Sequence, residues 1–515
     1  MSVVPVKNLG QGGLNKDTAP VNLQPNIFTD ALNVRFKNGA VETILGETTF
    51  RTPTNTPDVG MHWQRPDAGY TILGKGGVIN RVSSSGVETA MLNAPGTYTG
   101  SVWQTDYFGG GYAIIFNDGD HAPLYALYQD PLADLSLIPF PGWNYSPGLT
   151  VTAKVLRPFG YSIVAANLTI NDGVTSKYAP ASLRISVQAP IGGFPSIWEP
   201  GLTTDTADEF EINTKTPIVD LYELRGQMFI YSSDSVHILS LVNGIPNVRP
   251  YSLGYGAMSV NCVCEVDGMH FVVDRNDIYS HNGSGKVTSM VYGRMRDFFY
   301  GDLNQSYTDK TFVVKNNKFK EIWVCYVSSG NTNGKCDKAL IYNYKEDNWT
   351  IRTLPGVTNI FPSPNLSGVS WQQGNERLLA TTGANRVHLL DDGYQMYSVS
   401  GSAYTDYTSY AERSRLFTED PFGNNYIDGL TPVLEVSDVT DTVQVYVTSQ
   451  NMYDKAPDFS NISGRDMFTI SPRSESQGYK VDPRTVGRFL NYRIQSDAYW
   501  KLSFLGLSLR PANRR

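Results

Sequence analysis

Short apolar runs, each followed by a polar turn, recur along most of the chain. Each copy opens on a glycine, or once on a phenylalanine, and continues with an apolar run, a turn and usually a second apolar run. The copies begin at Gly69, Gly111, Gly160, Gly226, Gly268, Phe319 and Gly374. Successive starts are 42 to 66 residues apart, close to the length of four antiparallel strands in a propeller blade. The pattern predicts an all-β fold whose residues 58–395 form a β-propeller of about six to eight blades.

The middle runs of these copies are apolar on both faces, which is typical of strands that lie between neighbouring sheets. Examples are "FIY" at 229–231, "FVV" at 271–273 and "IWVCYV" at 322–327. One blade cannot bury both of its faces alone, so blades stack around an axis until the ring closes. Two irregular insertions, residues 128–148 and 189–210, are rich in Pro, Gly and Trp, and we expect them to protrude as loops.

The N-terminal segment, residues 1–57, predicts a β-hairpin. Residues 31–36 alternate inward and outward side chains at period two, and Asn38-Gly39 is a strong signal for a two-residue turn. The return strand takes its apolar residues from Val41, Ile44 and Leu45.

The C-terminal segment, residues 396–515, has strand patterns without the blade spacing. Alternating apolar positions occur at Val443, Val445 and Val447 and again at Leu505, Leu507 and Leu509. We expect a separate β-sandwich or platform domain there, to which the N-terminal hairpin contributes strands, because chain ends often meet at the surface.

Composition supports a β-rich globular protein and argues against two function classes. Hydrophobic residues make up 41% and charged residues 18%, and no long segment has the periodicity of a helix. The net charge of −7 argues against a surface that grips nucleic acid, which needs clustered Lys and Arg. Because neither a signal peptide nor an apolar run of about 18 residues is present, we expect a soluble protein made in a cytosol, with no membrane span.

The chemistry-bearing residues do not form a catalytic, cofactor-binding or metal-binding motif. The four cysteines occur as C-x-C at Cys262 and Cys264 and singly at Cys325 and Cys336, without a histidine at ligand spacing. Buried packing therefore explains them better than zinc does. The six histidines form no HExxH motif, and no GxSxG or phosphate-binding loop is present. We predict no catalytic residues, no cofactor and no metal.

Two weaker patterns leave alternatives open. Propeller glycosidases gather arginines, a tyrosine and a carboxylate at the axis, and the candidates here are Arg184, Arg225, Arg275, Arg294 and Arg296. The S-x-D-x-G-x-T-W boxes of sialidases are missing, so ordinary surface ion pairs explain these arginines better. The acidic stretches 117–120 and 389–394 are too short for a calcium-binding EF-hand loop and predict β-turns.

Three parts of the sequence together resemble one known family. The opening "GLNKDTAPVNLQPNIFTDALNVRFKNGAVETILG" carries a pattern of Gly13, Asn15, Asp17, Pro25, Asp30, Ala31, Asn33, Val34 and Gly39. The central "EVDGMHFVVDRNDIYSHNG" and "KALIYNYKEDNWTIR" and the C-terminal "GRFLNYRIQSDAYWKLSFLGLSLRP" add to it. In these features the chain resembles the tail nozzle proteins of short-tailed bacteriophages (podoviruses), also called tail tubular or packaged-DNA-stabilisation proteins.

The resemblance implies a structural protein of the virion tail, assembled in the cytoplasm of a host bacterium. It implies a homohexamer beneath the head-to-tail adaptor ring, with propellers facing outward and the terminal strands around a central channel. The ring would retain the genome, pass the DNA at infection without binding it specifically, and support a fibre, spike or tip protein. Because an acidic wall repels DNA, we expect carboxylates to outnumber basic side chains on the channel lining.

Two other functions remain open on the propeller pattern alone. A cytosolic kelch-like interaction adaptor would be a monomer. A propeller glycosidase would hold an Arg, Tyr and carboxylate cluster in an axial pocket.

Overall fold

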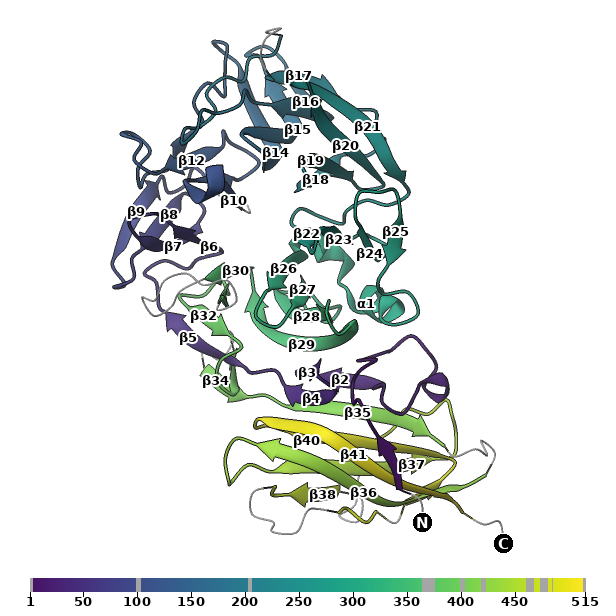
Figure 1. The fold of residues 1–515 in the computed structure, drawn as a ribbon. Helices are drawn as coiled ribbons and strands as arrows, with labels where there is room; N and C mark the ends of the chain where they lie inside the picture. Colours follow the sequence, from purple (N-terminus) through teal and green to yellow (C-terminus); the bar gives the residue numbers. More distant parts are fainter. Residues whose placement is uncertain are drawn as a thin grey trace.

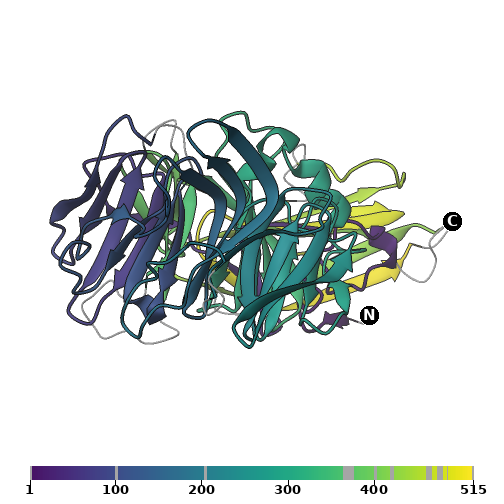
Figure 2. The ribbon, with the colours of Figure 1, turned by 90° about the horizontal axis from the view of Figure 1, so that it is seen from above.

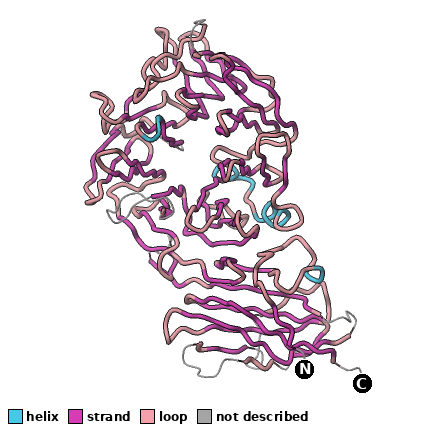
Figure 3. Tube along the Cα trace, in the orientation of Figure 1, coloured by secondary structure: helices cyan, strands magenta, loops and turns pink. Residues whose placement is uncertain are grey.

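The computed structural model describes residues 3–98, 103–201, 206–363, 376–398, 403–417, 423–459, 467–472, 480–483 and 485–512. Within these ranges the chain is built almost wholly of strands and turns (Figure 3). One short α-helix, α1 (Arg296–Asp302), and three 3-10 helices, η1 (Pro20–Asn22), η2 (Gly109–Gly111) and η3 (Gln305–Lys310), interrupt them. In the described part of the chain no helix has the length and apolar character needed to cross a membrane.

The described residues form seven four-stranded antiparallel sheets arranged in a ring (Figure 1), which confirms the predicted propeller. Blades one to three are β6–β9 (Val59–Gln64, Gly69–Lys75, Val78–Val82, Glu88–Asn93), β10–β13 (Gln104–Phe108, Ala113–Asn117, Leu124–Leu127, Ile138–Pro139) and β14–β17 (Thr150–Phe159, Ser162–Asn171, Ser176–Ile185, Asp208–Glu211). Blades four to six are β18–β21 (Ile218–Leu224, Gln227–Ser232, Ser235–Val242, Ile245–Leu253), β22–β25 (Val263–Val266, Met269–Val273, Ile278–His281, Val287–Ser289) and β26–β29 (Phe312–Asn316, Glu321–Tyr326, Cys336–Asn343, Asn348–Val357).

The glycines that open the sequence repeats mark the turn between the first and second strand of a blade. Gly160, Gly226 and Gly268 each lie between these two strands and have φ of 57°, 74° and 74°. Such left-handed backbone favours glycine, which has no Cβ to clash. In these three blades the repeat in the sequence is therefore the repeat of one tight turn, whereas Gly69 is the first residue of β7 and Gly374 lies outside the described residues.

The seventh blade is closed by a strand from the other end of the chain. Its first three strands are β30 (Asn359–Ser363), β31 (Arg377–Thr381) and β32 (Val387–Leu390), and its outer strand is β5 (Glu47–Arg51), which pairs antiparallel with β32. The expected N-terminal boundary at residue 57 assigned β5 to the platform, whereas the structure places it in the propeller. The pairing joins residues more than 300 positions apart and so leaves no local signal.

Strands from both chain ends form a second module of two sheets beside the ring, as predicted for the platform. One sheet has the order β3-β4-β41-β36-β39, with β1 also on β41, and the other has the order β2-β35-β40-β37-β38. The N-terminal strands are β1 (Val3–Val6), β2 (Asp30–Leu32), β3 (Val34–Lys37) and β4 (Ala40–Thr43). The C-terminal strands are β35 (Ser409–Leu416), β36 (Asn425–Val436), β37 (Val443–Gln450), β38 (Met467–Ile470), β39 (Thr485–Gly487), β40 (Phe489–Ser496) and β41 (Trp500–Pro511).

A two-stranded ribbon, β33 (Gln395–Ser398) with β34 (Ala403–Asp406), lies between the last blade and the platform. In the view turned by 90° the two chain ends lie together on the platform side of the ring (Figure 2). One apolar core runs across the boundary, because buried Phe36 and Trp500 of the platform belong to the same cluster as Trp349 of blade six.

The predicted N-terminal hairpin is present but shorter than the alternation suggested. Val34 to Lys37 pairs with Ala40 to Thr43, and the turn residues Asn38 and Gly39 have φ of 52° and 71°. The prediction of one strand over residues 31–36 is wrong, since Asn33 has φ of 57° and sends the chain from one platform sheet to the other. Asparagine tolerates this conformation better than other side chains do.

The two Pro- and Trp-rich insertions do not simply protrude. Phe140 and Trp143 from the first, and Phe194 and Trp198 from the second, are buried together beside blades two and three. The Trp143 and Trp198 rings meet edge to face with centroids 4.7 Å apart. The expectation of protruding loops is wrong for these side chains, because the two insertions cover each other and extend the core.

Candidate functional site

The inner strands of the propeller enclose a cavity of about 1050 Å³ along the axis. All seven first strands, β6, β10, β14, β18, β22, β26 and β30, contribute lining residues and surround the central opening in Figure 1. Five acidic and five basic side chains line it, so the lining has no net formal charge. They are Asp58, Asp106, Glu265, Asp309, Glu376, Lys75, Arg157, Lys310, Lys315 and Lys335.

The Arg157 guanidinium of β14 is held at the cavity wall by acceptors from neighbouring blades. Its Nε and Nη2 donate to the two oxygens of Asp220 at 3.1 and 3.2 Å, and Nη2 also donates to Asn261 Oδ1 at 2.7 Å. Asp220 is fully buried and also accepts the backbone N–H of Asn261 at 2.8 Å. Arg157 therefore has its main donors occupied within the protein.

Asp106 of β10 is held less tightly than Asp220. Its Oδ2 lies 3.5 Å from Arg157 Nη1, and its Oδ1 accepts the backbone N–H of Tyr107 at 2.8 Å. Burial raises the pKa of Asp106, and the charge of Arg157 only partly opposes that rise. Burial alone would lower the pKa of Arg157, but the charges of Asp220 and Asp106 raise it above its ordinary value. Arg157 is thus charged, and Asp106 keeps lone pairs free to accept further hydrogen bonds.

Two tyrosines line the cavity. Tyr107 has 41% of its surface exposed although it lies on an inner strand, and its hydroxyl donates to the carbonyl oxygen of His62. Tyr222 of β18 also lines the cavity and packs edge to face on His270 with ring centroids 5.3 Å apart. A partly exposed carboxylate, that of Asp106, and two tyrosines therefore line the cavity together with a guanidinium whose charge is compensated by Asp220.

The five arginines considered for a glycosidase cluster do not converge. Arg184 is fully buried inside blade three, 3.5 Å from Glu209. The others lie in loops or at the start of α1, and none of them lines the axial cavity: Arg225, Arg275, Arg294 and Arg296. The arginine at the axis is Arg157, which the sequence reasoning missed. The sequence signal for Arg157 is its place between Leu156 and Pro158 in an apolar run. A charged side chain in such a run is expected to be buried and therefore paired with acceptors.

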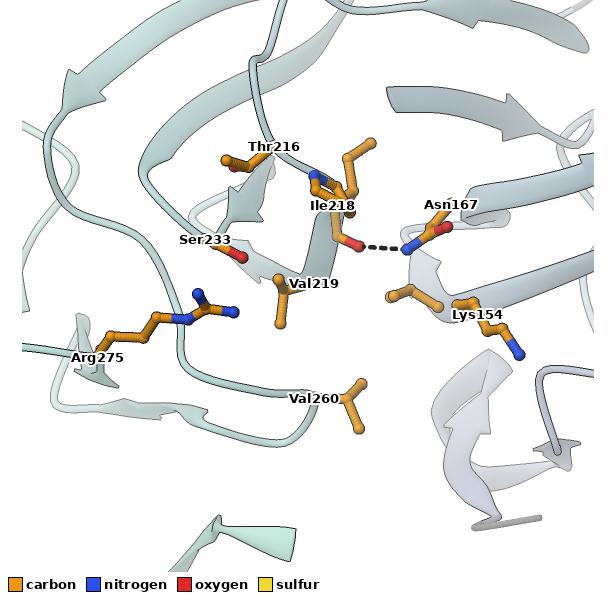
Figure 4. A pocket seen from close by; sticks show the side chains of 10 residues that line it. Lys154, Asn167, Thr216, Ile218, Val219, Ser233, Val260 and Arg275 are labelled. Atoms are coloured by element: carbon orange, nitrogen blue, oxygen red, sulfur yellow. Dashed lines mark hydrogen bonds between the residues drawn. The ribbon is translucent and has the colours of Figure 1, made fainter. Parts of the chain in front are cut away.

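A second, smaller pocket of about 390 Å³ lies between blades three and four (Figure 4). Asn167 Nδ2 donates to the carbonyl oxygen of Ile218 at 2.9 Å, and the Arg275 side chain points inward from the opposite side. Lys154 also lines this pocket but pairs with Asp120 at 2.6 Å.

The first acidic stretch forms a turn, as predicted. Asp118 Oδ1 accepts the backbone N–H groups of Asp120 and His121 at 3.1 and 2.9 Å, which closes the turn at 117–120. In the second stretch Asp391 has φ of 57° and is buried. Across the described residues no group of three or more His, Cys, Asp and Glu side chains is placed to hold a metal ion.

A buried ionic network joins the platform to the propeller. Arg35 of β3 donates from Nε and Nη2 to Glu321 of β27 and from Nη2 to Asp391 at 3.2 Å. Arg352 of β29 donates to Asp391 at 3.2 Å and lies 3.7 Å from Glu47. Three carboxylates thus face two guanidiniums, and burial raises the pKa of Glu47 to about 7 although Arg352 opposes it. The network fixes the N-terminal strands against blades six and seven.

The four cysteines are buried and form no disulfide. Burial raises the pKa of the Cys262 and Cys264 thiols to about 12. They therefore act as small apolar side chains, as the sequence indicated.

The strand pairing defines a seven-bladed β-propeller joined to a β-sandwich. No protein-family model matches the chain, and no curated protein matches it. Solved structures to which the chain is similar include a streptogramin B lyase (10% identity, TM-score 0.39, 67% of this chain and 96% of that one). Others are Saccharomyces cerevisiae Sqt1 (11%, 0.38, 68% and 99%) and virginiamycin B lyase from Staphylococcus aureus (9%, 0.40, 67% and 97%). A likeness at this level carries no argument about activity.

Proposed function

We propose that this chain is a structural protein of a short-tailed phage tail, the nozzle whose ring forms the distal DNA channel. In this role it retains the packaged genome, passes it at infection and supports a fibre, spike or tip protein. The proposal takes the protein to be non-catalytic, and its partners to be five further copies and the adaptor ring.

The observation that carries the proposal is the way both chain ends enter the platform. β41 from the C-terminus pairs with β1 and β4 from the N-terminus, and β5 then continues into the propeller. The buried network around Arg35 and Asp391 fixes the two modules against each other. Such a rigid joint suits a part that carries a mechanical load.

Electron microscopy of the purified chain, alone and mixed with its adaptor ring, tests the proposal. We expect six-fold rings in at least one of the two samples, with the platforms at the inner wall. Met467 lies on the edge strand β38 and is 38% exposed, so Met467→Lys places a charge at an expected ring contact. Tyr292→Lys, on the propeller at a residue that is 75% exposed, is the matched control and should leave the rings intact.

A monomer in both samples contradicts the nozzle proposal and favours an interaction adaptor. If Met467→Lys leaves the rings unchanged, the proposed nozzle function stands, but β38 does not form the contact between copies in the ring.

One observation favours a second candidate, a propeller glycosidase. Arg157, Tyr222 and Asp106 do meet in the axial cavity. The Arg157 donors are, however, already engaged by Asp220 and Asn261, which leaves little capacity to bind a substrate carboxylate. Release of reducing sugar from glycoside substrates by the wild type, and its loss in Asp106→Asn, would support this candidate over the nozzle.

A further inference from the structure

The charges that line the axial cavity balance in number, and several of them are paired within the protein. Lys75 pairs with Asp58 at 3.0 Å, and Lys310 pairs with Asp309 at 3.1 Å. Arg157 is held by Asp220 and Asp106, as described above. A strongly charged ligand would therefore find no opposite charge in excess, which disfavours both polyanions and polycations.

The same lining offers hydrogen-bonding capacity to a neutral ligand. Asp106, 32% exposed at its side chain, and Glu265, which accepts only the backbone N–H of Gly268 at 2.7 Å among the described residues, keep free acceptor positions. Acceptors that are partly removed from water gain free energy when a ligand supplies the missing partner.

Aromatic surface completes the pattern. Tyr107, with 41% of its surface exposed, lines the cavity from β10, and Tyr222 lines it from β18. Aromatic faces pack against the C–H surfaces of sugar rings, and carboxylates accept from their hydroxyls. A cavity of about 1050 Å³ is at the upper end of the usual range for ligand sites and accommodates several sugar rings.

We propose that the axial cavity binds a neutral oligosaccharide between the Tyr107 and Tyr222 surfaces, with Asp106 accepting its hydroxyls. The cavity binds the ligand without cleaving it. The inference does not depend on the nozzle function, because it uses only the propeller and not the platform or the oligomeric state.

Saturation-transfer NMR of the full chain with five probes tests the proposed oligosaccharide binding. Maltopentaose, cellopentaose and chitopentaose are the neutral probes, and spermidine and penta-galacturonate are the charged ones. We expect saturation transfer to at least one neutral probe and to neither charged one. Tyr107→Ala should weaken that binding about tenfold or more, since it removes the largest exposed ring of the lining.

Tyr222→Ala removes the second aromatic surface and tests the site where Tyr107→Ala fails to fold. We expect a several-fold loss of binding. Tyr292→Ala, on an exposed residue outside the cavity, should bind as the wild type does. Transfer to spermidine or penta-galacturonate alone, transfer to no probe, or neutral binding unchanged in both tyrosine variants overturns the proposal. Six-fold rings without sugar binding would leave the nozzle function standing and remove this inference only.

Discussion

Tyr231 links two buried histidines, and replacing it with phenylalanine should destabilise the propeller by several kcal/mol. Its hydroxyl lies 2.6 Å from His270 Nδ1 and 2.7 Å from His281 Nε2. His270 Nε2 contacts the carbonyl oxygen of Glu223 at 3.1 Å and must donate to it, so His270 Nδ1 is the acceptor for the Tyr231 proton. The Tyr231 oxygen then accepts the Nε2–H of His281.

The magnitude follows from the groups that Tyr231→Phe leaves without partners. These are His270 Nδ1 and His281 Nε2, on side chains that are fully buried and 2% exposed. Each orphaned buried polar group costs about 1–3 kcal/mol, so we expect a loss of about 4 kcal/mol in the free energy of unfolding. Burial lowers the pKa of His270 to about 3, with the charge of His281 adding to the effect, and burial lowers that of His281 to about 4. At pH 7.5 both rings are therefore neutral, and no protonation change adds to the difference.

Urea unfolding followed by tryptophan fluorescence measures the loss. Tyr251→Phe is the matched control from the same blade, because the Tyr251 hydroxyl accepts an exposed backbone N–H, that of Gly285 at 3.2 Å, and joins no pair of buried side chains. Its effect should stay within about 0.5 kcal/mol. If Tyr231→Phe loses no more than this control, the proposed proton arrangement around Tyr231 is wrong.

Three further predictions concern the joint, a turn and the thiols. Burial raises the pKa of Glu47 from its ordinary value of 4.5 to about 7, because the buried site favours the protonated acid. As pH rises from 4.5 to 7, the free energy of unfolding of the wild type should therefore fall by about 2–3 kcal/mol relative to that of Glu47→Gln. Parallel profiles of stability against pH for the two proteins would contradict this. Gly39→Ala should destabilise the protein by about 1 kcal/mol in thermal unfolding, because Gly39 has φ of 71°. Gly301→Ala inside α1, where a Cβ would meet open space, should stabilise it slightly. A change of the same sign in both variants would refute the argument about the turn. Ellman's reagent should label less than one thiol per native chain and all four after denaturation, since the cysteines are buried and their pKa values are raised; fast labelling of the native chain would show that a thiol is accessible.

The sequence repeats predicted the ring because the blades repeat a feature that is local in the sequence. A glycine turn between two apolar strands, as at Gly226 and Gly268, can be recognised from a few consecutive residues. The Asn38-Gly39 turn is equally local. These features are set by backbone sterics, so composition and spacing were enough to find them.

The remaining features depend on pairings that no local pattern records. The break at Asn33 interrupts an alternation that suggested one strand, and β5 joins a blade built from residues more than 300 positions later. Arg157 was missed because its acceptors, Asp220 and Asn261, come from two later blades. The axial site is therefore visible only once the ring has brought the inner strands together.

The closing strand also sets the order in which a ribosome can complete this molecule. β5 is made early, but its partner β32 ends at Leu390, so the ring stays open until three-quarters of the chain has been synthesised. β1 and β4 wait longer still, because their partner β41 ends at Pro511. Nascent chains therefore carry unpaired strand edges through most of translation, and slow synthesis or a shortage of chaperones should reduce the yield of this protein more than its final stability suggests.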